Sequence, residues 1–105
     1  MWKEVAEAIA ETTSRSFELQ GEYSIGGGCI NDARRLEGAV GENYFAKANS
    51  PDFLPLFEAE AAGLAEMAAT KTVRVPEPIC SGIAGGRSYL VLEFVEIGSS
   101  GADSQ

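Results

Sequence analysis

The stretch that decides the fold is Asn43–Asn49, NYFAKAN, a short run with the alternation of a β-strand. Alternation places Phe45 and Lys47 on the same face of that strand, so the lysine shares the side of an aromatic core residue. Glu60 follows thirteen residues after the lysine, inside a segment that predicts a helix. The spacing predicts that the lysine and the glutamate face each other across the two elements.

The helix that carries Glu60 is predicted to start after Ser50, with Ser50 as N-cap and Pro51 at the first position, and to run to about Thr70. Its apolar stripe is expected to comprise Phe53, Leu56, Phe57, Leu64 and Met67. Glu60 interrupts this stripe. Burying an unpaired carboxylate is costly, so one directed at the core needs a cation as partner, and the nearest cation on a core-facing strand is Lys47. Two alternatives stay open: a lysine that snorkels to the surface, and a rotated helix that leaves Glu60 in water.

The remaining pattern predicts an α+β fold with a five-stranded, mostly antiparallel sheet. A short amphipathic helix is expected over residues 2–13, and a strand over residues 17–25 with a bend or bulge at Gly21. Two hairpins are expected, one from residues 31–38 and 43–49 and one from residues 78–83 and 88–95. One face of the sheet should be covered by the long helix, and the other is expected to be exposed.

Composition excludes several classes of protein. The 105 residues carry 8 Lys and Arg against 16 Asp and Glu, a formal net charge of −8. This charge argues against binding to nucleic acid and against binding to an anionic membrane surface. No apolar run approaches the roughly 18 residues of a membrane span, and acidic residues interrupt the N-terminal segment where a signal peptide would be apolar. The two cysteines make no disulfide framework, and a cytoplasmic location is expected.

A glycine triplet precedes the strand lysine. Residues 26–28 are all glycine and are followed by Cys29, Ile30 and Asn31, and such a loop lets backbone N–H groups approach phosphate oxygens. The alternative is a plain tight turn, and the loop lacks the Gly-Lys-Ser/Thr of a P-loop. The order of glycine loop, strand lysine and helix glutamate is that of the nucleotide lobe of kinases.

These segments resemble the fructosamine kinase (ketosamine-3-kinase) family, which is related to aminoglycoside phosphotransferases within the protein-kinase-like fold. The resemblance covers nearly all of residues 1–98. It is carried by the segments IGGGCIN (25–31), YFAK (44–47), FEAEAAGL (57–64), VRVPEP (73–78) and YLVLEF (89–94). The combination of the glycine loop with the FEAE helix is specific to that family.

The resemblance implies an ATP site and a reaction. Residues Gly26, Gly27, Gly28, Cys29, Ile30 and Asn31 would cover the ATP phosphates. Lys47 would contact the α- and β-phosphates with Glu60 as its partner, Leu92 would be the gatekeeper, and the backbone of Glu93 and Val95 would hold adenine. The family moves the γ-phosphoryl group of ATP, with Mg²⁺, to the 3-hydroxyl of a ketosamine, free or on a glycated protein. The unstable 3-phosphate then releases the amine.

The resemblance also implies a division of labour along the chain. Residues 1–97 would form the nucleotide-binding lobe, and residues 98–105 a linker towards a catalytic lobe that supplies the Mg²⁺ ligands and the acceptor site. The 105 residues alone are therefore expected to be inactive. Alternatives are the lobe of a kinase for aminoglycosides or choline, and a non-catalytic interaction module. Cys29 is further predicted to form an intermolecular disulfide and so a homodimer.

Overall fold

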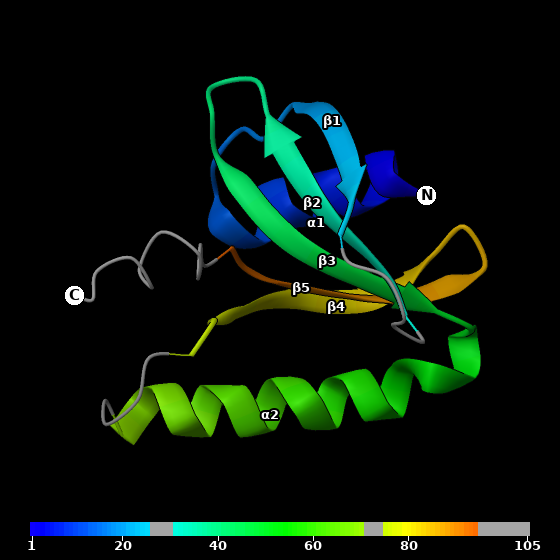
Figure 1. Cartoon of the computed structure of the whole chain (residues 1–105), viewed down its shortest axis with the longest axis vertical. Helices are drawn as coiled ribbons and strands as arrows, with labels where there is room; N and C mark the ends of the chain where they lie inside the picture. The colour runs from blue at the N-terminus through cyan, green and yellow to red at the C-terminus, as the bar shows by residue number, and fades with distance from the viewer. Residues whose placement is uncertain (26–30, 71–74, 95–105) are drawn as a thin grey trace.

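The fold was analysed in a computed structural model of the chain, which describes residues 1–25, 31–70 and 75–94. Five strands form one sheet in the order β1-β2-β3-β5-β4, and each neighbouring pair is antiparallel (Figure 1). The strands are β1 (Leu19–Ser24), β2 (Asp32–Gly38), β3 (Asn43–Asn49), β4 (Pro78–Ala84) and β5 (Arg87–Glu93). The predicted α+β class, both hairpins and the bulge are confirmed, since the β1–β2 register shifts between Leu19 and Gly21.

The β4–β5 connection shows how local sequence sets one of these hairpins. Gly85 and Gly86 have φ values of 59° and 76°, and two successive residues with positive φ make the two-residue turn whose twist matches antiparallel strands. Glycine adopts this region without a steric penalty. The turn therefore fixes the register in which Arg87 pairs with Ala84.

The first helix, α1 (Trp2–Thr13), covers one face of the sheet. Its apolar side buries Val5 and Ile9 completely, against small or branched residues of the sheet such as Ala46 and Val91. The helix ends at Thr13, and the C-cap residue Ser14 adopts a left-handed φ of 58° and donates its N–H to the Ala10 carbonyl. The expectation of an exposed second sheet face is wrong, because the amphipathic helix over residues 2–13 packs on that face.

The second helix, α2 (Leu54–Thr70), lies on the opposite face, as Figure 1 shows. Its buried residue Phe57 packs with Leu90 and Leu92 of β5. Ser50 occupies the position before the helical segment, but its side chain makes no capping hydrogen bond. Instead the segment begins with the 3₁₀ turn η1 (Pro51–Phe53), in which the Phe53 N–H donates to the Ser50 carbonyl at 3.0 Å.

Candidate functional site

The predicted ion pair is formed. Lys47 Nζ lies 2.6 Å from Glu60 Oε2, which confirms the contact expected from strand alternation and helix spacing. Lys47 sits in the middle of β3, opposite Ala33 of β2 and Leu90 of β5, and its side chain is 15% exposed. The strand neighbours of Lys47 are thus small or apolar, and within the described part of the chain Glu60 is its one carboxylate partner.

The helix reaches this lysine in a different orientation from the one expected. Leu56 and Met67 are 59% and 44% exposed, so the apolar stripe predicted to include them is wrong at both positions. The face that meets the sheet is formed by Phe57 with partly buried neighbours at helical spacing, namely Phe53, Ala61 and Leu64. Glu60 therefore lies at the border of that face, 39% exposed, and approaches the lysine from the rim rather than from the core.

The remaining capacity of Lys47 matters for chemistry. An ammonium group carries three N–H donors, and the carboxylate of Glu60 takes one. The Phe57 ring centroid lies 6.0 Å from Nζ, at the outer limit of a cation–π contact. Two donors are thus available for anionic oxygens, and charge-assisted hydrogen bonds of this kind suit phosphate groups.

Two asparagines complete the polar end of this face. Asn49 Nδ2 donates to Asn31 Oδ1 at 2.8 Å, and Asn49 Oδ1 accepts from the Ser50 N–H at 2.7 Å. Asn49 lies two residues beyond Lys47 on the same side of β3, about 7 Å along the strand. Asn31 is the one described residue of the predicted phosphate-covering loop. Gly26, Gly27, Gly28, Cys29 and Ile30, with the predicted thiol chemistry, lie outside the described residues.

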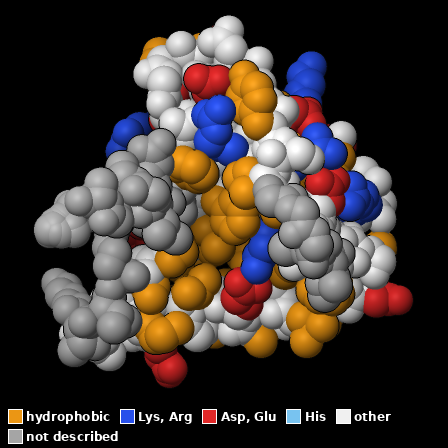
Figure 2. All heavy atoms as spheres, in the orientation of Figure 1, with side chains coloured by type: hydrophobic (Ala, Val, Ile, Leu, Met, Phe, Trp, Pro, Cys, Tyr) orange, Lys and Arg blue, Asp and Glu red, His pale blue; other side chains and the backbone are white. Residues whose placement is uncertain are grey.

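The opposite end of the face holds the residues predicted for adenine. Leu92 is 3% exposed and pairs with Phe45 across β3 and β5. The Glu93 N–H donates to the Glu77 carbonyl at 2.8 Å, so this N–H belongs to the sheet and does not face a ligand. Val95 lies outside the described residues. Between α2 and the strands, Figure 2 shows hydrophobic side chains gathered on the surface.

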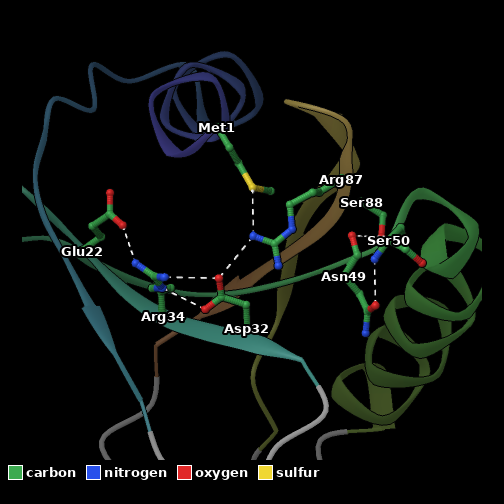
Figure 3. A network of polar contacts seen from close by, with 8 residues as sticks. All are labelled: Met1, Glu22, Asp32, Arg34, Asn49, Ser50, Arg87 and Ser88. Carbon is green, nitrogen blue, oxygen red and sulfur yellow. Dashed lines mark hydrogen bonds and ion pairs between the residues drawn. The ribbon is translucent and has the colours of Figure 1, made fainter.

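A second ionic cluster lies on the α1 side of the sheet (Figure 3). The Asp32 carboxylate accepts from Arg34 Nε at 2.9 Å and from Arg87 at 3.3 Å, and Arg34 also pairs with Glu22. The hydrogen bond from Arg34 is the main cause that lowers the pKa of Asp32, and the same bond raises the pKa of Arg34. The charged groups of this cluster pair with one another, and they lie on the α1 face, opposite Lys47. The cluster therefore stabilises the fold and is not part of the Lys47 site.

Three further features bear on function. In the described part of the chain, no group of three or more Cys, Asp or Glu side chains is placed to hold a metal ion. The same residues contain no helix that is long and apolar enough to cross a membrane. Burial raises the pKa of the Cys80 thiol, while a hydrogen bond with Thr12 acts in the opposite direction, and a raised pKa disfavours the reactive thiolate form.

The antiparallel sheet with a strand lysine paired to a helix glutamate defines a kinase-like fold. The family model for fructosamine kinase matches residues 1–105, and the chain belongs to the fructosamine kinase family. Relatives include a "Probable ketoamine kinase" from Synechocystis sp., 46% identical over 98% of this chain and 35% of the relative. A "Protein-ribulosamine 3-kinase, chloroplastic" from Arabidopsis thaliana is 42% identical over 85% of this chain and 27% of the relative.

A solved structure gives the same picture of the fold. The crystal structure of a "Putative fructosamine-3-kinase" from Haemophilus somnus 129PT superposes with a TM-score of 0.84 at 28% identity. The match covers 91% of this chain and 32% of that structure. The chain thus spans between about a quarter and about a third of the length of these relatives.

Proposed function

We propose that this chain is the ATP-binding part of a kinase that phosphorylates ketosamines. The observation that carries the proposal is the 2.6 Å pair of Lys47 and Glu60, which holds the ammonium group in place and leaves it two further donors. Membership of a family whose named relatives are ketoamine and ribulosamine kinases supports the same function. ATP, when bound, supplies the γ-phosphoryl group that the acceptor hydroxyl receives.

The residues of this chain would bind and orient the nucleotide. Lys47 and Asn31 would donate to phosphate oxygens, with the other residues of the glycine loop, 26–30, beside them. Adenine would lie at the Leu92 end of the face, held by the backbone of residues 93 and 95.

The other parts of the reaction would belong to residues beyond this lobe. The described carboxylates do not cluster into a Mg²⁺ site, so no step of the reaction is assigned to a metal held by them. We propose residues 1–97 as the nucleotide lobe and residues 98–105 as the linker to a catalytic lobe. The acceptors would be small ketosamines or glycated proteins, with the phosphoryl group placed on the 3-hydroxyl. A cytoplasmic location and a homodimer stay predictions.

Nucleotide titration tests this proposal. Ligand-observed NMR should show ATP binding with a dissociation constant in the high-micromolar to millimolar range, about −4 to −5 kcal/mol, since one lobe supplies only part of a cleft. An ADP-release assay with fructoselysine should show no turnover by the purified 105-residue chain. Turnover would contradict the division into lobes, whereas failure to bind ATP would favour the interaction module.

A further inference from the structure

We infer that Asn49 is a positioning residue that sets which side of the Asn31 amide faces the nucleotide. The inference rests on the proposed function, because the ligand it concerns is the phosphate chain of ATP. Asn49 lies at the end of β3, outside the YFAK segment (44–47) that carries the family resemblance in this strand. Its role follows from the direction of three consecutive polar groups: the Ser50 N–H, the Asn49 side chain and the Asn31 side chain.

The chain of hydrogen bonds starts at a group with only one possible direction. A backbone N–H can donate and cannot accept, so the atom of Asn49 that lies 2.7 Å from the Ser50 nitrogen must be its oxygen. The other end of the same amide is then the Nδ2 group, which can only donate. The orientation of Asn49 therefore does not depend on the usual ambiguity between amide oxygen and nitrogen.

The same logic passes to Asn31. Because Asn49 Nδ2 donates at 2.8 Å, the atom of Asn31 that receives this bond must be Oδ1. The Asn31 Nδ2 group, with its two donors, then points away from Asn49. Among the described residues none accepts a hydrogen bond from this group. A pair of donors at the strand end that follows Lys47 fits an anionic ligand and does not fit a cation or a hydrogen-bond donor.

The backbone at Ser50, where this chain of hydrogen bonds starts, is itself fixed by a hydrogen bond. Ser88 of β5 is completely buried, and its hydroxyl donates to the Ser50 carbonyl at 2.7 Å. Figure 3 shows Ser88, Ser50 and Asn49 meeting where β3 leads into α2. Buried hydrogen bonds of this kind fix the backbone from which the Asn49 side chain projects. Asn49 thus presents its donor to Asn31 from a rigid strand end.

Two aspartate variants of the chain separate this role from a general structural one. In Asn31→Asp, the bond from Asn49 is kept, but the two donors become acceptors that face the phosphates. In Asn49→Asp, the bond from the Ser50 N–H is kept, but residue 49 can no longer donate. The Asn31 amide then turns round to donate to the new carboxylate at position 49 and presents its oxygen to the ligand. Both variants should lose affinity for ATP by roughly tenfold or more, as expected for a lost hydrogen bond to a charged group.

Adenosine and a matched charge variant serve as controls. Adenosine lacks phosphates, so its affinity should stay unchanged in both variants. Asn43→Asp adds the same charge to the same face of β3, about 20 Å along the strand from Asn49. Asn43 accepts from Arg35 at 2.7 Å, a bond that aspartate keeps, so this variant should bind ATP as the parent does.

A second measurement reads the amide orientation itself. In the ¹⁵N-labelled parent chain, the side-chain NH₂ protons of Asn49 should exchange slowly with water and those of Asn31 quickly. In Asn49→Asp, the Asn31 protons should become slow. The inference is overturned if Asn31 is protected in the parent, or if the parent binds ATP and the ATP-to-adenosine affinity ratio stays unchanged in Asn49→Asp. A parent that binds no ATP would overturn the proposed function as well.

Discussion

The two faces of the sheet use opposite kinds of side chain. The α1 face buries an apolar cluster that includes Val5, Ile9 and Val91, and its nearby charges pair with one another. The α2 face has a smaller apolar cluster, formed by Phe57, Leu90 and Leu92, and it carries a lysine and two asparagines towards its polar end. We therefore expect the first face to contribute most of the stability and the second to bind the ligand.

The largest effect is expected from the α1 face. Ile9→Ala removes a side chain with no exposed surface, and the lost burial plus the cavity should destabilise the fold by about 2–5 kcal/mol. Urea unfolding followed by far-UV circular dichroism measures this loss. Ile9→Val serves as the graded control, at about 0.5–1.5 kcal/mol. A loss below about 0.5 kcal/mol for Ile9→Ala would show that α1 contributes no core.

A substitution at Lys47 on the α2 face should change the affinity for ATP rather than the stability of the fold. Lys47→Met keeps the apolar stem and removes the ammonium group, so ATP affinity should fall roughly tenfold or more while the free energy of unfolding changes by less than about 1 kcal/mol. Lys3→Met makes the same charge change at an exposed position of α1 and should leave ATP affinity as it is. NMR titration and urea unfolding give the two quantities. Equal ATP affinity in the two methionine variants would remove Lys47 from the site.

The rotation of α2 can be tested with two leucines of the same helix. Leu64 packs with Phe57, whereas Leu56 is 59% exposed. Leu64→Ala should cost about 1–2 kcal/mol and Leu56→Ala less than about 0.5 kcal/mol, because only the first removes apolar contact with the sheet. The difference between the two urea midpoints measures this. A larger loss at Leu56 would restore the apolar stripe first predicted from the sequence.

The smallest effect is expected from the ionic cluster on the α1 side. The folded pKa of Asp32 is below its ordinary value, so its contribution to stability is present above about pH 4 and is lost as pH falls through the folded pKa. Asp32→Asn should therefore be less stable than the parent at pH 7, by up to about 1 kcal/mol, with the gap closing at lower pH. Urea unfolding at pH 7, 5 and 3 follows the gap, and Glu58→Gln on the exposed side of α2 is the control. A gap that widens on acidification would be contrary to this account.

What the sequence could predict depended on periodicity. The Lys47–Glu60 contact was predictable because strand alternation and a fixed helix spacing both constrain it. The covering of the second face was missed, although Tyr89–Leu92 carries apolar side chains on both sides of β5, as a strand covered twice requires. The rotation of α2 was missed because an alanine-rich helix offers several apolar faces, and the packing of Phe57 selects one. The Asn31–Asn49 bond joins a bend to a strand end and leaves no periodic signal.

Residue-resolved NMR tests the central claim most directly. ATP added to the ¹⁵N-labelled chain should shift the backbone signals of Asn31, Lys47 and Leu92 on the α2 face, and saturate at millimolar concentrations. The signals of Val5 and Ile9 in α1 should stay in place. Shifts confined to the α1 face, or no shifts at millimolar ATP, would contradict the assignment of this lobe to nucleotide binding.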